Sequence, residues 1–233
     1  MNFTPRIDNK LVCYQTWMQI AFTSRIRNTM TDSNSQREKL RQLMNTSPIA
    51  RHYELRHAGI AASTITRATH DGELIRISRG LYQRADGEVD TEQSLAEAAK
   101  LVPRGVIAMT SALAFHGLTD QMPRAVWVAI RAADWVPVPT YPPLRIIKLD
   151  DRYMQQGVEQ HTISGVTVPI FSVAKTLADV FRNKLVDRSV AIEALRAALQ
   201  QHKTTPAAIA QAAIDGGAWK KMRPYLEALT ADG

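Results

Sequence analysis

The sequence predicts an α+β protein, with an N-terminal winged helix-turn-helix followed by a mixed α/β domain that ends in a helical C-terminus. Three observations lead to this prediction. Short helical patterns followed by an alternating hairpin pattern lie within residues 35–84. Strand and helix patterns alternate in the middle of the chain, and only helical patterns follow residue 172. Three helices and a hairpin in close succession are the elements of a winged helix-turn-helix.

The first predicted helix has a clear start and a clear end. Ser35 and Glu38 have the spacing of a capping box, in which each residue satisfies a backbone N–H at the helix start. Leu40 and Leu43 supply an apolar face. The helix should end near Asn45, because a Ser-Pro pair follows and the residue before proline disfavours helical backbone.

Two more helices and a hairpin complete this part. A helix over Ile49–His57 is followed by Gly59, and a sharp turn between helices favours glycine because it requires a positive φ. A third helix is predicted over Ala61–His70. Alternating residues then predict strands over Glu73–Ile77 and Leu81–Arg84, joined by a turn at Ser78-Arg79-Gly80.

The second part is predicted from periodicity, caps and turn residues. A Ser-Gly pair separates two alternating runs and predicts a hairpin, and Pro206 suits the first position of a helix. The predicted strands are Val106–Met109, Ala125–Ile130, Leu144–Leu149, Val158–Ile163 and Val166–Ile170. The predicted helices are Thr91–Leu101, Ser111–His116, Ser172–Arg182, Asp187–Gln201, Thr205–Ile214 and Trp219–Leu229.

These patterns predict a division of the chain into three stretches. Residues 1–34 form an N-terminal extension that we expect to be disordered or loosely attached, because residues 1–29 lack a helical or strand period. Met30, which precedes a polar stretch, is a candidate start of translation. Residues 35–86 form the winged helix-turn-helix, and residues 91–233 form the C-terminal α/β domain.

The basic charge lies in the N-terminal half. The chain carries a net charge of +7. Residues 35–84 contain nine Lys or Arg against four Asp or Glu, whereas residues 85–233 contain sixteen of each. A basic segment joined to a neutral one indicates a polyanion partner for the first part.

Several other classes of protein are not favoured. A single cysteine, Cys13, excludes an internal disulfide and a multi-cysteine metal site, and the six histidines lack metal-ligand spacing, so no metal or cofactor is predicted. The apolar stretch 11–22 is interrupted and too short to span a bilayer, and it lacks the features of a signal peptide. We therefore expect a cytoplasmic protein without a membrane partner.

The third helix and the hairpin carry the candidate DNA-binding residues. Hydroxyl side chains and an arginine on one helix suit base edges in the major groove, and arginines on a wing suit phosphates. Arg51 and Arg56 are weaker candidates for phosphate contacts. The predicted DNA-binding residues are Ser63, Thr64, Thr66, Arg67, His70, Arg76, Ser78, Arg79 and Tyr82, although packing is the favoured role of Tyr82.

Five motifs of the chain are typical of one protein family. The first, Ser78-Arg79-Gly80-Leu81-Tyr82, follows the three-helix unit. The next two are residues 110–123, which read TSALAFHGLTDQMP, and residues 172–179, SVAKTLAD, followed by Arg182-Asn183-Lys184. The last two are residues 191–196, AIEALR, and 222–229, MRPYLEAL. On these motifs the chain resembles the AbiEi antitoxins, which are regulators from type IV toxin–antitoxin systems. The resemblance covers most of the chain from about Ser35 onward and does not include residues 1–29.

The resemblance implies an autorepressor that binds repeats in its own promoter and counters a cognate nucleotidyltransferase-like toxin, directly or indirectly, through residues 91–229. It also places His116 and Asp179 inside family-like motifs, where we interpret them as a hydrogen-bonded structural histidine and a capping or ion-paired aspartate. The alternative is a winged-helix regulator whose C-terminal domain senses a ligand or a protein unrelated to a toxin.

An enzyme is the less favoured class. Nucleotidyltransferase chemistry needs paired carboxylates to hold magnesium. The predicted strand Ala125–Ile130 has no acidic residue, and Asp134 stands alone beyond it. Phosphate-binding loops and nucleophile motifs are also absent from the sequence. We therefore predict that the protein is not an enzyme.

Overall fold

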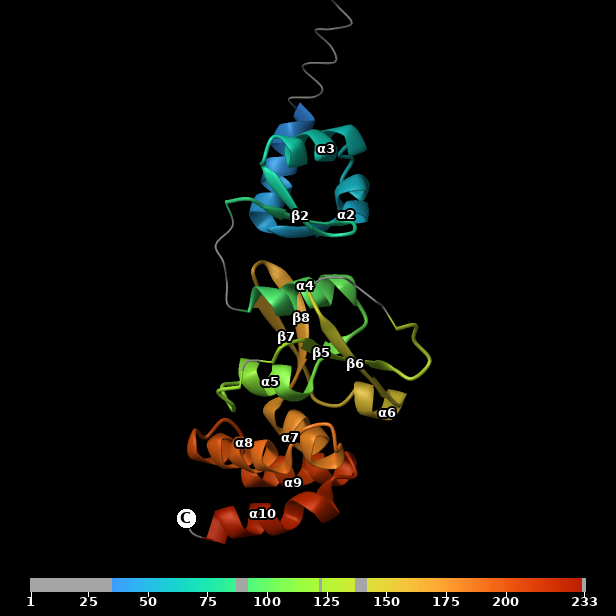
Figure 1. Ribbon diagram of the computed structural model, residues 1–233. Helices are drawn as coiled ribbons and strands as arrows, with labels where there is room; N and C mark the ends of the chain where they lie inside the picture. Colours follow the sequence, from blue (N-terminus) through green and yellow to red (C-terminus); the bar gives the residue numbers. More distant parts are fainter. Residues whose placement is uncertain (1–34, 87–91, 122, 137–141, 232–233) are drawn as a thin grey trace, which may run out of the picture.

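The computed structural model describes residues 35–86, 92–121, 123–136 and 142–231, and it confirms the predicted α+β class. Figure 1 shows the first part of the chain at one end, a mixed sheet in the middle and a group of helices at the other end. The predicted extension, with the candidate start at Met30, lies outside the described residues. No described helix is long and apolar enough to cross a membrane.

The first part of the chain, residues 35–86, contains three helices and a three-stranded antiparallel sheet. Leu40, Leu55, Ile60 and Ile65 are fully buried between the helices and the sheet. The strands are ordered β1-β3-β2, so the hairpin β2–β3 lies beside the short strand β1. The elements are a helix over residues 35–46, β1 (Ile49–Arg51), α2 (His52–His57), α3 (Ala62–His70), β2 (Leu74–Ser78) and β3 (Leu81–Arg84).

One predicted helix is partly wrong. The helix expected over Ile49–His57 begins only at His52, because Ile49–Arg51 is the strand β1. Ile49 pairs with Gln83 and Arg51 with Leu81. The extended conformation is therefore stabilised by strand pairing with residues far along the chain, which periodicity within a short segment cannot predict.

The second part is built on a five-stranded mixed sheet with the order β6-β5-β4-β8-β7. β5 runs parallel to β6 and β4 parallel to β8, whereas β4–β5 and β7–β8 are antiparallel. The elements are α4 (Gln93–Leu101), β4 (Val106–Ile107), α5 (Met109–Phe115), β5 (Val126–Arg131), β6 (Leu144–Leu149), α6 (Asp151–Met154), β7 (Val158–Ile163) and β8 (Val166–Phe171).

The predicted elements of this sheet are largely confirmed, with three corrections. The strand expected over Val106–Met109 has two residues, and Met109 already begins α5. The short helix α6 was not predicted. The helix expected from Thr91 begins at Gln93, and Thr91 itself lies outside the described residues.

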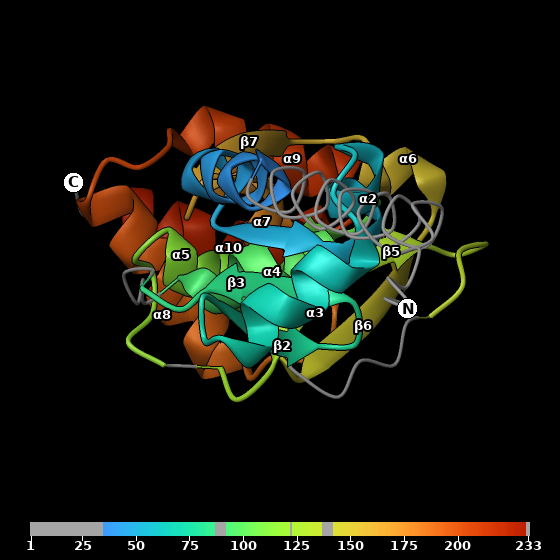
Figure 2. The same cartoon turned by 90° about the horizontal axis from the view of Figure 1, so that it is seen from above.

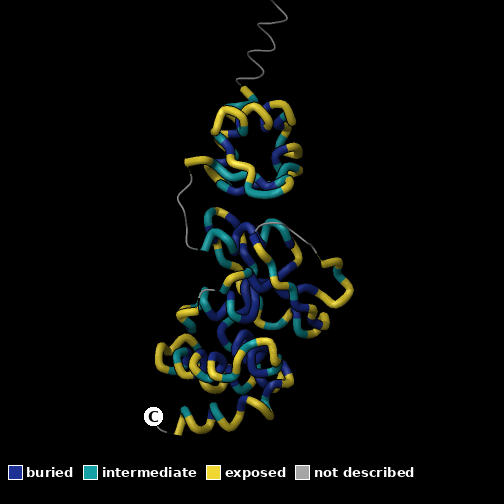
Figure 3. Tube along the Cα trace, viewed as in Figure 1, coloured by how far each residue is buried: buried dark blue, intermediate teal, exposed yellow. Residues whose placement is uncertain are grey.

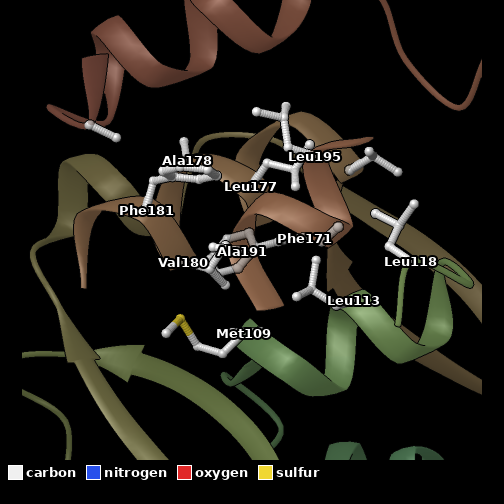
Figure 4. Packing of buried hydrophobic residues seen from close by; sticks show 14 of the residues in the cluster. Met109, Leu113, Leu118, Phe171, Leu177, Ala178, Val180, Phe181, Ala191 and Leu195 are labelled. Carbon is white, nitrogen blue, oxygen red and sulfur yellow. The ribbon is translucent and has the colours of Figure 1, made fainter. Parts of the chain in front are cut away.

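Four helices form the C-terminal end, as predicted to within about two residues. The first turns of the first three helices are capped by the side chains of Ser172, Asp187 and Thr205, which accept hydrogen bonds from backbone N–H groups. Figure 4 shows Phe171, Leu177 and Phe181 packed in the core between these helices and the sheet. The helices are α7 (Val173–Arg182), α8 (Arg188–Gln200), α9 (Pro206–Asp215) and α10 (Trp219–Ala231).

Strand β5, inside the central sheet, is buried on both faces. In β5, Trp127 and Ala129 pack in the cluster formed with the C-terminal helices, whereas Val126, Val128 and Ile130 pack with α4. This alternation follows from the two-residue period of a strand. The continuous burial of these residues is visible in Figure 3 as dark blue trace through the middle of the molecule.

The first part is packed directly on the second. Ile49 and Leu81, from β1 and β3, belong to the same buried cluster as Leu95 of α4. The turn between β7 and β8 also approaches closely, because a Cβ atom at Gly165 would lie 2.8 Å from Cδ of Pro48. The sheet of the first part is therefore covered by the second part, and α3 lies on the side away from it (Figure 1).

A buried carboxyl group, that of Glu97, lies on α4 near the junction of the two parts. Glu97 is 3% exposed, and its Oε1 accepts a hydrogen bond of 2.7 Å from Nε2 of Gln93. The same Nε2 donates to Oε1 of Gln83 on β3 at 2.8 Å. Burial raises the pKa of the Glu97 carboxyl, and the hydrogen bond from Gln93 only partly opposes this shift.

Replacing Glu97 by glutamine should therefore stabilise the protein at neutral pH. The raised pKa means that the folded state binds the proton of Glu97 more tightly than the unfolded state does. The stability that this proton provides is complete below the ordinary glutamate pKa of about 4.3. It is lost as the pH rises through the raised pKa of the folded state. The difference in free energy of unfolding between Glu97→Gln and the unmodified protein should grow from pH 4.5 to pH 8 in urea titrations. Glu193→Gln, at an exposed position, is the matched control. If the difference in free energy of unfolding between Glu97→Gln and the unmodified protein is constant with pH, the pKa of Glu97 is not raised in the folded state.

Candidate nucleic-acid interface

Helix α3 presents one polar face to solvent and one apolar face to the core. Ser63, Thr66, Arg67 and His70 are exposed, as expected for residues that contact a ligand. Ile65, on the opposite face, is 1% exposed and packs between the helices. Figure 2 views the molecule from the α3 end, with α3 in front of the strands of the first part.

Thr64 lies on the inner face of α3, contrary to the prediction. Its side chain is buried, and Oγ1 donates to Oε1 of Gln36 at 3.1 Å. The same oxygen of Gln36 accepts the N–H of Ala61 at 3.0 Å. Thr64 therefore helps to hold the start of α3 against the first helix and is not available to a base edge.

Gln36 was missed by the sequence analysis. Helix α3 has no side-chain cap from its own N-cap residue, Ala61. The amide oxygen of Gln36, in the preceding helix, instead accepts the N–H of Ala61 itself, over a sequence separation of 25 residues. No local pattern indicates such a contact, because capping signals describe residues within one turn of the helix start.

The turn before α3 has the predicted glycine. Gly59 adopts φ +79°, a left-handed conformation that favours glycine. Its N–H donates to the carbonyl of Arg56 at 3.0 Å, and the N–H of Ile60 donates to the carbonyl of Leu55 at 3.1 Å. Nη1 of Arg56 closes the turn with a 3.0 Å bond to the carbonyl of Ile60. Part of the guanidinium of Arg56 therefore serves the turn itself.

The hairpin β2–β3 is short, and its turn is hydrogen-bonded to the first residue of α2. Gly80, at φ +75°, accepts a hydrogen bond of 2.7 Å from the N–H of His52. Arg76 and Arg79 are exposed, in agreement with a role in contacting phosphates. The side chain of Arg76 makes a 3.4 Å contact with the carbonyl of Ser78, which belongs to the same hairpin.

Two other hairpin candidates point inward. Oγ of Ser78 is buried and has no hydrogen-bond partner among the described residues, so the expected contact of Ser78 with DNA is not supported. Tyr82 is half-buried and packs against the apolar cluster around Leu40, with its ring 6.1 Å from that of His52. This is the packing role favoured for Tyr82.

Ion pairs divide the basic residues of this part into two groups. Arg37 pairs with Asp71 and Glu73, and Arg41 pairs with Glu73 at 2.9 Å. The hydrogen bond from Arg37 lowers the pKa of Asp71. Four arginines form no ion pair with a described residue, and they lie in or beside α2 and the hairpin. These are Arg51, Arg56, Arg76 and Arg79.

The motif residues of the second part have structural contacts. Nε2 of His116 lies 2.8 Å from the carbonyl oxygen of Phe171, and burial lowers the pKa of His116. Asp179 is 1% exposed and forms ion pairs with Lys175 and Arg182. Both residues thus have the structural roles that we inferred from the sequence.

Comparison with known proteins supports the family resemblance predicted for the first part of the chain. Residues 38–85 match a family model described as a transcriptional regulator, AbiEi antitoxin. The resemblance to the AbiEi antitoxins is thereby confirmed for this segment, which contains α3 and the hairpin. The motifs in residues 110–229 lie outside the match and stay predictions. No curated protein sequence matches the chain.

The fold has a counterpart among solved structures. The crystal structure of the RV2827C protein from Mycobacterium tuberculosis is similar with a TM-score of 0.51, over 84% of this chain and 81% of that chain. The two sequences are 13% identical. At this identity the likeness shows a shared fold and carries no information about function.

Proposed function

From the match of residues 38–85 to regulators of the AbiEi antitoxin family, we propose that residues 35–86 are a winged helix-turn-helix that binds duplex DNA. The observation that carries this proposal is the exposed polar face of α3, with Arg67 on it, beside a hairpin that carries Arg76 and Arg79. Three helices and a three-stranded antiparallel sheet in this order are the elements of that motif.

In this proposal the polar residues of α3 and the arginines of α2 and the hairpin have different tasks. Ser63, Thr66, Arg67 and His70 enter the major groove, where hydroxyl and guanidinium groups can bond base edges. The arginines of α2 and the hairpin bind phosphates and supply affinity without sequence preference. The net charge of the first part, with nine basic against four acidic residues over 35–84, supports contact with a polyanion.

We further propose that the protein is an autorepressor and antitoxin without catalytic activity of its own. Its DNA target is then a set of repeats in its own promoter, and its second partner is a cognate nucleotidyltransferase-like toxin that it opposes directly or indirectly. The support is the family of residues 38–85 and the AbiEi-like motifs of residues 110–229. Co-expression with the product of a nucleotidyltransferase-like gene immediately downstream should relieve growth arrest, and continued arrest would contradict the antitoxin role.

The DNA-binding function is tested by fluorescence anisotropy. The full-length protein is titrated into a labelled duplex from its own upstream region and into a scrambled duplex, at several salt concentrations. We expect tight binding that prefers the native duplex and weakens steeply with salt. Equal and weak binding to both duplexes would contradict specific DNA binding and would leave the first part with a basic surface alone.

Arg79→Ala should mainly change the salt dependence. Arg79 is exposed at the hairpin turn, where a guanidinium can reach a phosphate. Loss of one phosphate contact reduces the slope of log K against log salt by about 1 and weakens binding to both duplexes alike. Lys203→Ala, at an exposed position beyond α8, is the control. A selective loss of binding to the native duplex would instead mean that Arg79 contacts a base.

A further inference from the structure

A pocket lies where the two parts of the chain meet. Its walls come from α2 of the first part and from α4 and β8 of the second, and its volume is about 310 Å³. Pockets of roughly 300–1,000 Å³ accommodate small molecules and occur preferentially between domains. The residues that line it are Tyr53, Glu54, Ala99, Lys100, Pro103, Gly165, Val166, Thr167 and Pro169.

The two charged groups that line this junction pocket, Glu54 and Lys100, balance each other, and a further cation, Arg51, lies next to the lining residue Tyr53. Nζ of Lys100 lies 2.9 and 3.0 Å from the two carboxylate oxygens of Glu54, so this pair is neutral. Beside it, the guanidinium of Arg51 lies 5.5 Å from the ring centroid of Tyr53 and forms no ion pair with a described residue. A ligand with a single negative charge would balance the site.

Lys100 can bind such a ligand without first losing Glu54. An ammonium group has three N–H donors. Two of them are directed to the oxygens of Glu54, and the third has no protein acceptor among the described residues. The side chain of Lys100 is 17% exposed and lines the pocket, so a carboxylate there would form a partly desolvated, charge-assisted hydrogen bond.

The other walls favour a flat apolar body on the same ligand. Tyr53 is 51% exposed, so a ligand can reach its ring from solvent. Pro103, Val166 and Pro169 present apolar surface to the same pocket. We propose that the junction pocket binds a small aromatic carboxylate, with its carboxylate at Lys100 and its ring against Tyr53.

Occupation of the pocket would be linked to DNA binding, and this consequence rests on the proposed function of the first part. Oε2 of Glu54 accepts the N–H of Arg51 at 2.7 Å and thereby caps α2. The same carboxylate binds α2 to Lys100 of α4. A carboxylate bound to the third N–H of Lys100 shares the ammonium charge with Glu54 and weakens the contact that holds α2. Helix α2 leads through Gly59 into α3. Ligand and DNA would then change each other's affinity by the same factor.

The pocket is tested by NMR on the ¹⁵N-labelled full-length protein. Benzoate is titrated first, followed by 1-naphthoate and indole-3-carboxylate as larger probes, and benzamide serves as the uncharged isostere of benzoate. We expect saturable shifts of the amides of Ala99, Lys100, Gly165 and Thr167 for at least one carboxylate, and at least tenfold weaker binding of benzamide. Lys100→Met should weaken carboxylate binding at least tenfold, with a dispersed spectrum showing that the variant is folded.

Arg104→Met is the matched control. Arg104 is a neighbouring cation that pairs with Asp134 at 2.6 Å and does not line the pocket. Its replacement should leave the shifts unchanged. Absence of saturable shifts with all three carboxylates, or shifts of equal size in Lys100→Met, would overturn the proposed site.

A second measurement separates the site from the proposed function. Anisotropy titrations with the upstream duplex are repeated in the presence of the tightest-binding carboxylate. We expect the carboxylate to change the DNA affinity of the unmodified protein and to leave that of Lys100→Met unchanged. Binding in the NMR titration with an unchanged DNA affinity would support the pocket and overturn the linkage. Binding in the NMR titration by a protein that binds no DNA would overturn the proposed function while leaving the pocket in place.

Discussion

Asp179→Ala is expected to lower the free energy of unfolding by about 3–5 kcal/mol, the usual cost of removing one partner from a buried ion pair. Both oxygens of Asp179 lie 2.8 Å from Nζ of Lys175, and Oδ1 lies 2.9 Å from Nη2 of Arg182. The side chains of Asp179 and Lys175 are 1% and 3% exposed. Urea titrations followed by tryptophan fluorescence measure the loss, which is a large part of a typical stability of about 5–15 kcal/mol.

The cost arises from the cations that remain. Burial lowers the pKa of Lys175, and Asp179 opposes this shift. Without the carboxylate, Lys175 must either stay charged in an apolar environment or release its proton. The double variant Lys175→Met/Asp179→Leu should lose less stability than Asp179→Ala, because it removes both members of the most buried pair. Equal losses would show that the packing of Asp179 itself, and not the unpaired lysine, carries the effect.

Arg67→Ala is expected to weaken binding to the native upstream duplex by about 1–3 kcal/mol, or about 5- to 150-fold, while changing binding to scrambled DNA much less. Arg67 is exposed in the middle of α3, between Ser63 and His70 on the same polar face. An arginine in the major groove can form two hydrogen bonds with guanine, and loss of both removes discrimination at that base pair. Parallel anisotropy titrations on the two duplexes measure the effect.

Arg196→Ala provides the control for charge alone. Arg196 is exposed on α8, at the far end of the molecule from α3 (Figure 1). It should leave the preference for the native duplex unchanged. If Arg67→Ala weakens both duplexes by the same factor, Arg67 binds a phosphate and the sequence preference must come from Ser63, Thr66 or His70.

Most of the fold follows from local patterns. The cap residues Ser172, Asp187 and Thr205 accept backbone hydrogen bonds at the starts of the helices that the sequence predicts. The glycine turn at Gly59 has the positive φ that its place between two helices requires. Such features are predictable because each is decided within about one turn of helix or one tight turn.

The candidate interface was predicted less completely. The sequence places Ser63, Thr66, Arg67, Arg76 and Arg79 among the binding residues, and the structure leaves all of them exposed. It buries the side chain of Thr64 and the hydroxyl of Ser78, because α3 and β2 each have an inner face that composition alone does not identify. A polar residue type is compatible with either face.

By itself, the sequence determined the α+β class, the order of most elements and the concentration of basic charge in the first part, since these depend on residues close together in the chain. Only the tertiary structure decided that Ile49–Arg51 is a strand, that Gln36 is hydrogen-bonded to the start of α3, and that Lys100 binds Glu54. These contacts join residues 25 to 46 positions apart. Their energies depend on which surfaces meet after the chain has folded, and no local periodicity records that pairing.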